Sequence, residues 1–481
     1  MALTAFACAG MLLTVPLSGQ GDASQARQAQ RYSLPLPVVR VLGNGLSCAF
    51  IERRTVPLVT VEVVVQAGAE ADPPGAPGTA SLVARLLPQG TTTQTAGQIA
   101  ESVDQAGADL ETGADWDRST SSMTVLSNHA DLAFDVLADI VEHPAFPASQ
   151  LQQIRQRILS ALEVERADPA YLADEALRVR LFAGTPYGHP LDGTRASLRR
   201  ITPQALEAFH AEYYRPSNAF VLILGDLSEN QAFGLATRYF GGWKPMPPPA
   251  QIPPSKPLGG KSRAITVIDD PAAVQTAIRI GNLAVSRAAP QFEALVIANQ
   301  VLGGPAVNRL YNALRTRRGL VYGASSRLEC YRTLGAWMAS ASTRTADTAE
   351  ALRIMLSQIQ NMSRGDVLPS EDGMAEDYLI GHQALQFESF PGMASSFLPL
   401  MVYDLPLDAW NLFPYRIRSL SLDQVDQVAR QYIRPEGEVV VLAGDAAKFA
   451  GQLKRFGTVR VIPLSRLDFS SSRLEGPAAP N

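Results

Sequence analysis

Apolar residues recur along the chain in two patterns, one typical of strands and one typical of amphipathic helices. Residues 39–66 predict two strands, interrupted at Asn44-Gly45 and again near Arg53-Arg54. Strands are also expected at the start of 264–282. A spacing of apolar residues near 3.6 predicts helices elsewhere. The predicted helices are 93–110, 130–142, 147–166, 171–182, 291–302 and 346–363.

Two 25-residue segments, 202–226 and 421–445, share one pattern without a gap at an offset of 219 residues. Each begins with a residue suited to a helix N-cap, Thr202 or Ser421, and continues as an amphipathic helix. Each helix is expected to end at an Arg-Pro pair, after which an apolar strand runs into Gly-Asp. The equal spacing favours an internal duplication over a chance recurrence of the same helix–turn–strand unit.

The duplication predicts an α+β fold of two homologous domains, each an antiparallel-type sheet packed with helices. We place these domains at residues 38–244 and 261–465. Between them, 245–257 carries seven prolines in thirteen positions, and proline fixes φ and lacks an N–H. We therefore assign 245–260 to a stiff proline-rich linker. Residues 466–481 are expected to form a flexible tail.

The amino-terminal residues 1–27 have the pattern of a secretory signal peptide. An uncharged, mostly apolar run at 2–17 is followed by small and polar residues, although no basic residue precedes Arg27. An uncleaved membrane anchor is the alternative, but a span needs about 20 apolar residues. We expect a periplasmic or secreted protein whose mature form has no membrane segment.

Composition narrows the classes of function. The chain has a net charge of −4 and shows no basic stripe, which argues against nucleic acid as a partner. Its three cysteines, Cys8, Cys48 and Cys330, form no CxxC pair. No two of its five histidines lie within five residues of each other, which excludes every short two-histidine zinc motif.

Residues 78–91 read GTASLVARLLPQGT and resemble the zinc motif of the pitrilysin/insulinase-type peptidases, the inverzincins. In that family two histidines four residues apart on a helix bind zinc, and a glutamate acts as the general base. The resemblance places Ser81 and Arg85 at the histidines and Ala84 at the glutamate, and it places Ala161 at the third ligand. It therefore implies that this chain holds no metal.

Residues 303–322 carry a second part of the same resemblance. In the family, a glycine-rich segment precedes an Arg/Tyr pair with the seven-residue spacing of Arg315 and Tyr322. The resemblance implies that both side chains stabilise the oxyanion of peptide hydrolysis, a role in which one donor is worth about 3 kcal/mol. Otherwise Arg315 is a surface cation and Tyr322 a core aromatic. Gly303 and Gly304 form either a substrate-handling loop or a packing pair.

The resemblance covers about residues 39–446 and implies a zinc-less subunit of a heterodimeric zinc metallopeptidase. Its partner would be a homologous HxxEH-bearing subunit that holds the zinc, and its substrates would be peptides. The alternative is a non-enzymatic structural or assembly protein of the same fold. A stand-alone peptidase with relocated ligands is disfavoured because the histidines are scattered.

Overall fold

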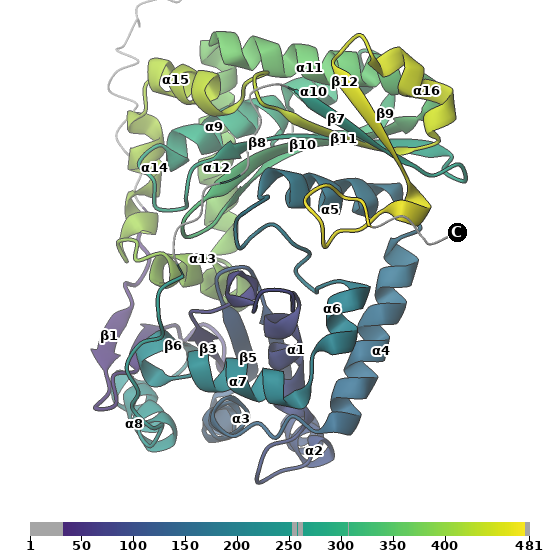
Figure 1. Ribbon diagram of the computed structural model, residues 1–481. Coiled ribbons are helices and arrows are strands. Elements are labelled where there is room, and N and C mark those ends of the chain that lie inside the picture. The colour runs from purple at the N-terminus through teal and green to yellow at the C-terminus, as the bar shows by residue number, and fades with distance from the viewer. Residues whose placement is uncertain (1–31, 253–256, 258–262, 306, 477–481) are drawn as a thin grey trace, which may run out of the picture.

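Each half of the chain folds into a six-stranded sheet packed with helices (Figure 1). The computed structural model describes residues 32–476 apart from 253–256, 258–262 and 306. The expected signal peptide, 1–27, lies outside the described residues. No helix in the described part of the chain is both long and apolar enough to span a membrane.

The first sheet has the strand order β1-β2-β6-β3-β5-β4. Its central strands are buried on both faces, which explains their nearly continuous apolar sequences. The strands are β1 Val38–Val41, β2 Ser47–Glu52, β3 Leu58–Val65, β4 Asp109–Ala114, β5 Ser119–Leu126 and β6 Ala219–Gly225. The helices are α1 Thr79–Leu86, α2 Ala96–Gln105, α3 Ala130–Glu142, α4 Ala148–Glu165, α5 Pro169–Leu181, α6 Arg195–Arg200, α7 Pro203–Tyr213 and α8 Glu229–Phe240.

The second sheet has the order β12-β7-β11-β8-β10-β9. Its strands are β7 Ala264–Asp269, β8 Gln275–Ala284, β9 Val321–Cys330, β10 Gly335–Arg344, β11 Val439–Gly444 and β12 Thr458–Pro463. Its helices are α9 Phe292–Gly303, α10 Arg309–Tyr311, α11 Thr348–Arg364, α12 Pro369–Gln386, α13 Phe390–Val402, α14 Ala409–Ser419, α15 Leu422–Tyr432 and α16 Ala446–Leu453.

The two repeats occupy equivalent places, which confirms the duplication. Helices α7 and α15 begin after Thr202 and Ser421, whose side chains accept hydrogen bonds from the third residue of each helix. Strand β6 lies parallel to β2 and antiparallel to β3, and β11 lies parallel to β7 and antiparallel to β8. The sheets are therefore mixed rather than purely antiparallel.

Two sequence expectations about individual segments are wrong. Residues 39–66 contain three strands instead of two, because the turn at Asn44-Gly45 separates β1 from β2. Residues 466–476 are not a flexible tail: Leu467, Phe469 and Leu474 are buried, and Phe469 packs edge-on against Tyr171. Part of the linker is held as well, since Arg215 and Ser217 donate hydrogen bonds to carbonyls of 245–252.

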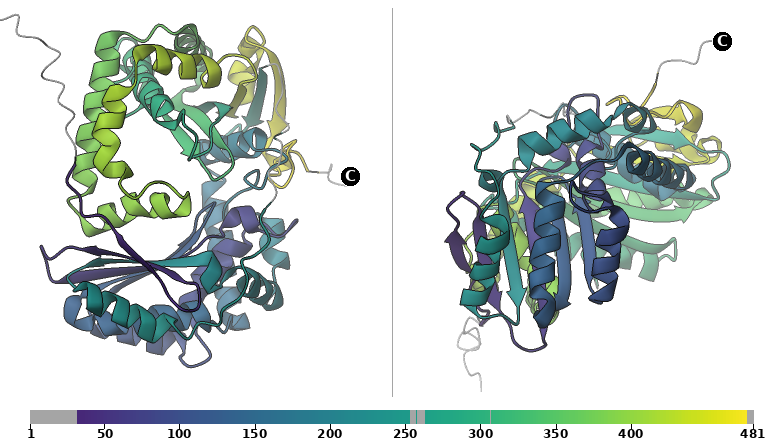
Figure 2. Two further views of the ribbon diagram at one scale, coloured as in Figure 1. Left: turned by 90° about the vertical axis from the view of Figure 1, so that its left-hand side faces the viewer. Right: turned by 90° about the horizontal axis from the view of Figure 1, so that it is seen from below.

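Each half covers a face of the other half's sheet with one helix. Helix α5 belongs to the first half and packs on β8 and β11 of the second (Figure 1). Helix α13 belongs to the second half and packs on the first sheet (Figure 2). On the opposite faces lie the two halves' own cores. The two helices thus lie where the halves meet, each packed on the sheet of the other half.

Candidate functional site

Helix α1 carries three of the four degenerate zinc-motif positions. Gly78 precedes it in the left-handed region, with φ of 93°, a conformation that glycine adopts readily. The Asp72 carboxylate accepts hydrogen bonds from the N–H groups of Gly78 (2.6 Å) and Ala80 (2.8 Å), which satisfies the start of the helix. The family frame is therefore folded as a helix even though its ligands are replaced.

Ser81 and Arg85, which stand at the two histidine positions of the family motif, both contact Asp192. Arg85 donates from Nη2 to both carboxylate oxygens of Asp192, at 3.1 and 3.2 Å, and from Nε to Ser81 Oγ at 3.2 Å. The Ser81 hydroxyl in turn donates to Asp192. A guanidinium charge thus stands where the family resemblance places a metal ligand.

These residues do not fit a zinc ion. Ser81 and Arg85 already use their polar atoms on Asp192, while Ala84 is fully buried and Ala161, on α4, has no ligating atom. Across the described ranges, no three His, Cys, Asp or Glu side chains gather closely enough to hold a metal ion. We therefore derive no chemical step from a metal bound to this chain.

A cavity of about 1140 Å³ opens in front of these positions, on the face of the first sheet turned toward α13. Arg85, Ala161 and Asp192 line it together with residues of β3, β4 and β5. Glu165, four residues after Ala161 on α4, also lines it. Burial, followed by the charge of Asp192, raises the pKa of Glu165. Glu163 instead pairs with Arg195.

Sequence reasoning missed two residues of this cavity, Asp192 and Glu62. Asp192 is 107 residues from Arg85, so no local pattern joins them. Glu62 interrupts an otherwise apolar strand, LVTVEVVV, and this isolated charge is the signal that could have found it.

The structure brings Arg315 and Tyr322 together. Arg315 lies in a π-helical turn, Asn312–Thr316, and its guanidinium carbon is 5.8 Å from the centre of the Tyr322 ring. The guanidinium also donates to the carbonyl of Val321 at 3.4 Å. Such π-helical turns are frequent at functional sites. Tyr322 is 90% exposed, so the alternative in which it is a core aromatic is wrong.

Arg315 and Tyr322 line a second cavity, of about 570 Å³, formed over β8, β9 and β10. These strands are the counterparts of β3, β4 and β5 in the duplicated topology. The two cavities have no lining residue in common. Within one chain, the Arg/Tyr pair and the degenerate zinc helix therefore belong to separate, topologically equivalent cavities.

Gly303 and Gly304 end helix α9 and are buried. A Cβ atom on Gly303 would lie 2.4 Å from the backbone nitrogen of Ser326, and one on Gly304 would lie 2.6 Å from the Cα of Gln300. Both glycines thus allow close packing of α9 against its surroundings.

Two protein-family models match consecutive parts of this chain. Residues 48–195 match the family model described as Insulinase (Peptidase family M16), and residues 200–372 match the one described as Peptidase M16 inactive domain. The chain belongs to peptidase family M16. The boundary between the two matches falls just before the first repeat, within the first structural half of this M16 chain.

Relatives of this M16 chain include proteins named as zinc proteases. An uncharacterized zinc protease of Mycobacterium tuberculosis is 25% identical over 445 residues, covering 90% of this chain and 97% of that protein. One of Bacillus subtilis is 21% identical over 346 residues, covering 72% and 83%.

Two solved structures share the fold. A crystal structure of a peptidase M16 inactive domain from Pseudomonas fluorescens has a TM-score of 0.79 and 27% identity, covering 89% of this chain and 99% of that one. A protease from Helicobacter pylori has a TM-score of 0.76 and 19% identity, covering 85% and 100%.

Proposed function

We propose that this M16 chain is the zinc-less subunit of a heterodimeric zinc metallopeptidase that hydrolyses peptides. It donates Arg315 and Tyr322, together with a wall of the substrate chamber, to a homologous HxxEH-bearing subunit. That partner supplies the zinc and the general base, and both subunits work in the periplasm or outside the cell. The observation that carries the proposal is the exposed Arg315–Tyr322 pair on a cavity separate from the degenerate zinc helix.

The chemistry of the pair supports this role. Hydrolysis of a peptide bond develops negative charge on the carbonyl oxygen, and a guanidinium and a phenol both donate hydrogen bonds at neutral pH. Both groups are exposed, and among the described residues Arg315 contacts the Val321 carbonyl and the Tyr322 ring and forms no ion pair. Both donors are therefore accessible to a substrate held between two subunits.

Reconstitution with the HxxEH subunit tests the proposal. The chain alone should not hydrolyse peptides, and mixing it with that partner should restore activity. Arg315→Ala or Tyr322→Phe should then lower kcat about 10²-fold while leaving complex formation intact, because each removes one oxyanion donor. Steady-state kinetics on the purified complex, with complex formation followed by gel filtration, measures both.

Arg317→Ala is the matched control, since Arg317 is an exposed arginine two residues from Arg315 that does not line the second cavity. Its kcat should stay within about twofold of the wild type. Normal turnover in the Arg315→Ala, Tyr322→Phe double variant would instead support a structural or assembly role.

A further inference from the structure

Glu62 is a buried carboxylate without a partner on one of its oxygens. It lies on β3 and lines the first cavity, yet the residue is only 9% exposed. Its Oε2 atom has no hydrogen-bond partner, and its Oε1 atom is 3.5 Å from Ser122 Oγ. Burial of an unpaired carboxylate is costly, so a group of this kind in a native protein needs an explanation.

The second half of the chain has a charged residue, Arg279, at the position equivalent to Glu62. In the first sheet Leu222 of β6 pairs with Glu62, and in the second sheet Val441 of β11 pairs with Arg279. Leu222 and Val441 are separated by the 219-residue repeat offset, so Glu62 and Arg279 are equivalent positions. Each half therefore places one charged residue at this point of the sheet face.

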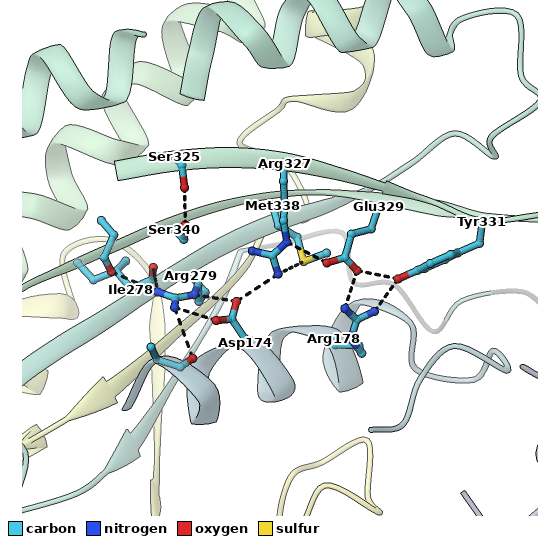
Figure 3. A network of polar contacts seen from close by, with 12 residues as sticks. Asp174, Arg178, Ile278, Arg279, Ser325, Arg327, Glu329, Tyr331, Met338 and Ser340 are labelled. Atoms are coloured by element: carbon cyan, nitrogen blue, oxygen red, sulfur yellow. Dashed lines mark hydrogen bonds and ion pairs between the residues drawn. The ribbon is translucent and has the colours of Figure 1, made fainter. Parts of the chain in front are cut away.

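Arg279 is satisfied by α5, the helix that covers it, together with the carbonyls of Ile278 and Ala341 in its own sheet. Asp174 of α5 accepts from Arg279 Nε at 2.9 Å and from Nη2 at 2.8 Å (Figure 3). The two oxygens of one carboxylate thus meet two nitrogens of one guanidinium, the bidentate geometry of the stronger ion pairs.

The equivalent helix brings no charge to Glu62. Helices α5 and α13 each have 13 residues and begin after a side-chain N-cap, Asp168 and Ser389 respectively. Asp174 is the sixth residue after its cap, and Ser395 is the sixth after the other. Ser395 lines the same cavity as Glu62. The cation that would complete this pair is therefore not supplied by α13.

Carboxylates outnumber guanidinium groups around Glu62. Arg85 is paired with Asp192, and Arg118 lies 3.6 Å from Asp115. Burial raises the pKa of Glu62 to about 7, and the charge of Arg118 opposes this rise without cancelling it. The remaining charged residues of the lining are Glu62, Asp109, Glu111 and Glu165 against Arg157. Carboxyl side chains therefore predominate in the lining, and a bound cation would favour their ionised form.

We propose that the first cavity binds a cationic group of a peptide, with Glu62 as its anchor. In the second half, Asp174 supplies the counter-charge of Arg279. In the first half, the ligand supplies the counter-charge of Glu62 by bringing a guanidinium or an ammonium group to its Oε2 atom. The site is a binding site in the half that has lost the zinc-ligand residues. The choice of a peptide as the ligand rests on the proposed function, whereas the cation site itself does not depend on the role of Arg315 and Tyr322.

Calorimetric titration of the full chain, without any partner, tests the site. The first probe is a hexapeptide blocked at both ends with one central arginine, and its match carries citrulline, which is neutral and nearly the same shape. The arginine peptide should bind at least about tenfold more tightly, as expected for a charge-assisted contact to a buried carboxylate. A third hexapeptide has a free amino terminus and no basic side chain. Its binding shows whether the site takes an α-amino group as well as a side-chain cation.

The decisive variant is Glu62→Gln, which keeps the shape and removes the charge. It should abolish the preference for arginine over citrulline, whereas Glu207→Gln, at an exposed carboxylate on α7 that does not line this cavity, should change it less than about threefold. Ser395→Lys should also abolish it by supplying an internal cation. Thermal unfolding verifies that each variant is folded. Equal binding of the two blocked peptides, no measurable binding of either, or an unchanged preference in Glu62→Gln would overturn the proposal.

Discussion

At the scale of single residues, the sequence placed side chains well when the relevant partner was near in the chain. Arg315 and Tyr322 are seven residues apart and do meet. The partner of Arg85 could not be anticipated, because Asp192 comes from a distant segment. The cavity that Glu62 and Ser395 line together could not be anticipated for the same reason. The loss of ligating atoms at Ala84 and Ala161 follows from the sequence itself. The Arg85–Asp192 ion pair and the hydrogen bonds of Ser81 to both residues could be found only in the folded chain.

A substitution at Gly303 tests whether this glycine serves close packing or a substrate-handling loop. Gly303→Ala should lower the free energy of unfolding by about 1–3 kcal/mol, since the new methyl group would press on the Ser326 backbone. Gly323→Ala, on the adjoining strand β9, is the matched control, because a Cβ atom added there would meet nothing within 4 Å. Urea unfolding of both variants measures the difference. A Gly303→Ala protein as stable as the wild type would favour a mobile loop.

At the scale of elements, the amphipathic helices α3, α4 and α11 were predicted closely. Helices α3 and α11 turn an apolar face toward their own sheet, and α4 packs on α1 and α6. Helix α13 escaped prediction because Pro399 lies inside it and because apolar residues surround much of it. Its packing on the sheet of the other half joins residues far apart in the sequence, and local periodicity does not predict such contacts.

The Asp174–Arg279 pair fastens α5 to the second sheet. Arg279 is only 6% exposed, so Asp174→Asn leaves a buried guanidinium without its counter-charge and should cost about 3–5 kcal/mol at neutral pH. Asp347→Asn, which removes one member of the exposed Arg344–Asp347 pair, should cost less than about 1 kcal/mol. Chemical denaturation of the two variants provides the comparison.

The same pair predicts a pH dependence of stability. Burial acts to raise the pKa of Asp174, but the hydrogen bonds and charges of Arg279 and Arg327 outweigh it and hold the pKa below its usual value. The stabilisation is therefore present above the pKa of an unfolded aspartate, about 4, and is lost as the pH falls through the folded value. The difference in Tm between wild type and Asp174→Asn should shrink below about pH 4. A difference that stays constant into acid would contradict the ion-pair explanation.

At the scale of the whole molecule, the internal repeat predicted the two-domain architecture correctly, because equal spacing survives even where the residues have changed. It could not predict how the halves meet. Asp117 illustrates the connection: its buried carboxylate accepts from Tyr187 in the first half and from Tyr403 and the Arg332 N–H in the second. The two halves are therefore joined by polar contacts as well as by the exchanged helices.

The exchange predicts that neither half is stable alone. Separating the chain within 253–262 should give two fragments that are poorly soluble when expressed singly, since α5 and one sheet face would be exposed. Co-expression should return a soluble 1:1 complex, because the contacts between the halves do not depend on the linker. Gel filtration of the co-expressed and single fragments gives the readout. Monodisperse, folded single fragments would refute the interdependence.

The reciprocal placement of α5 and α13 also bears on how the duplication arose. Two identical chains that trade one helix form a domain-swapped dimer, in which each copy completes the other. This protein has that arrangement inside a single chain, with the donated helices at matching points of the two repeats. An ancestor of half the length would have left a sheet face bare until it met a second copy. Fusion of two such genes would make that encounter intramolecular, and the two copies could then diverge in sequence.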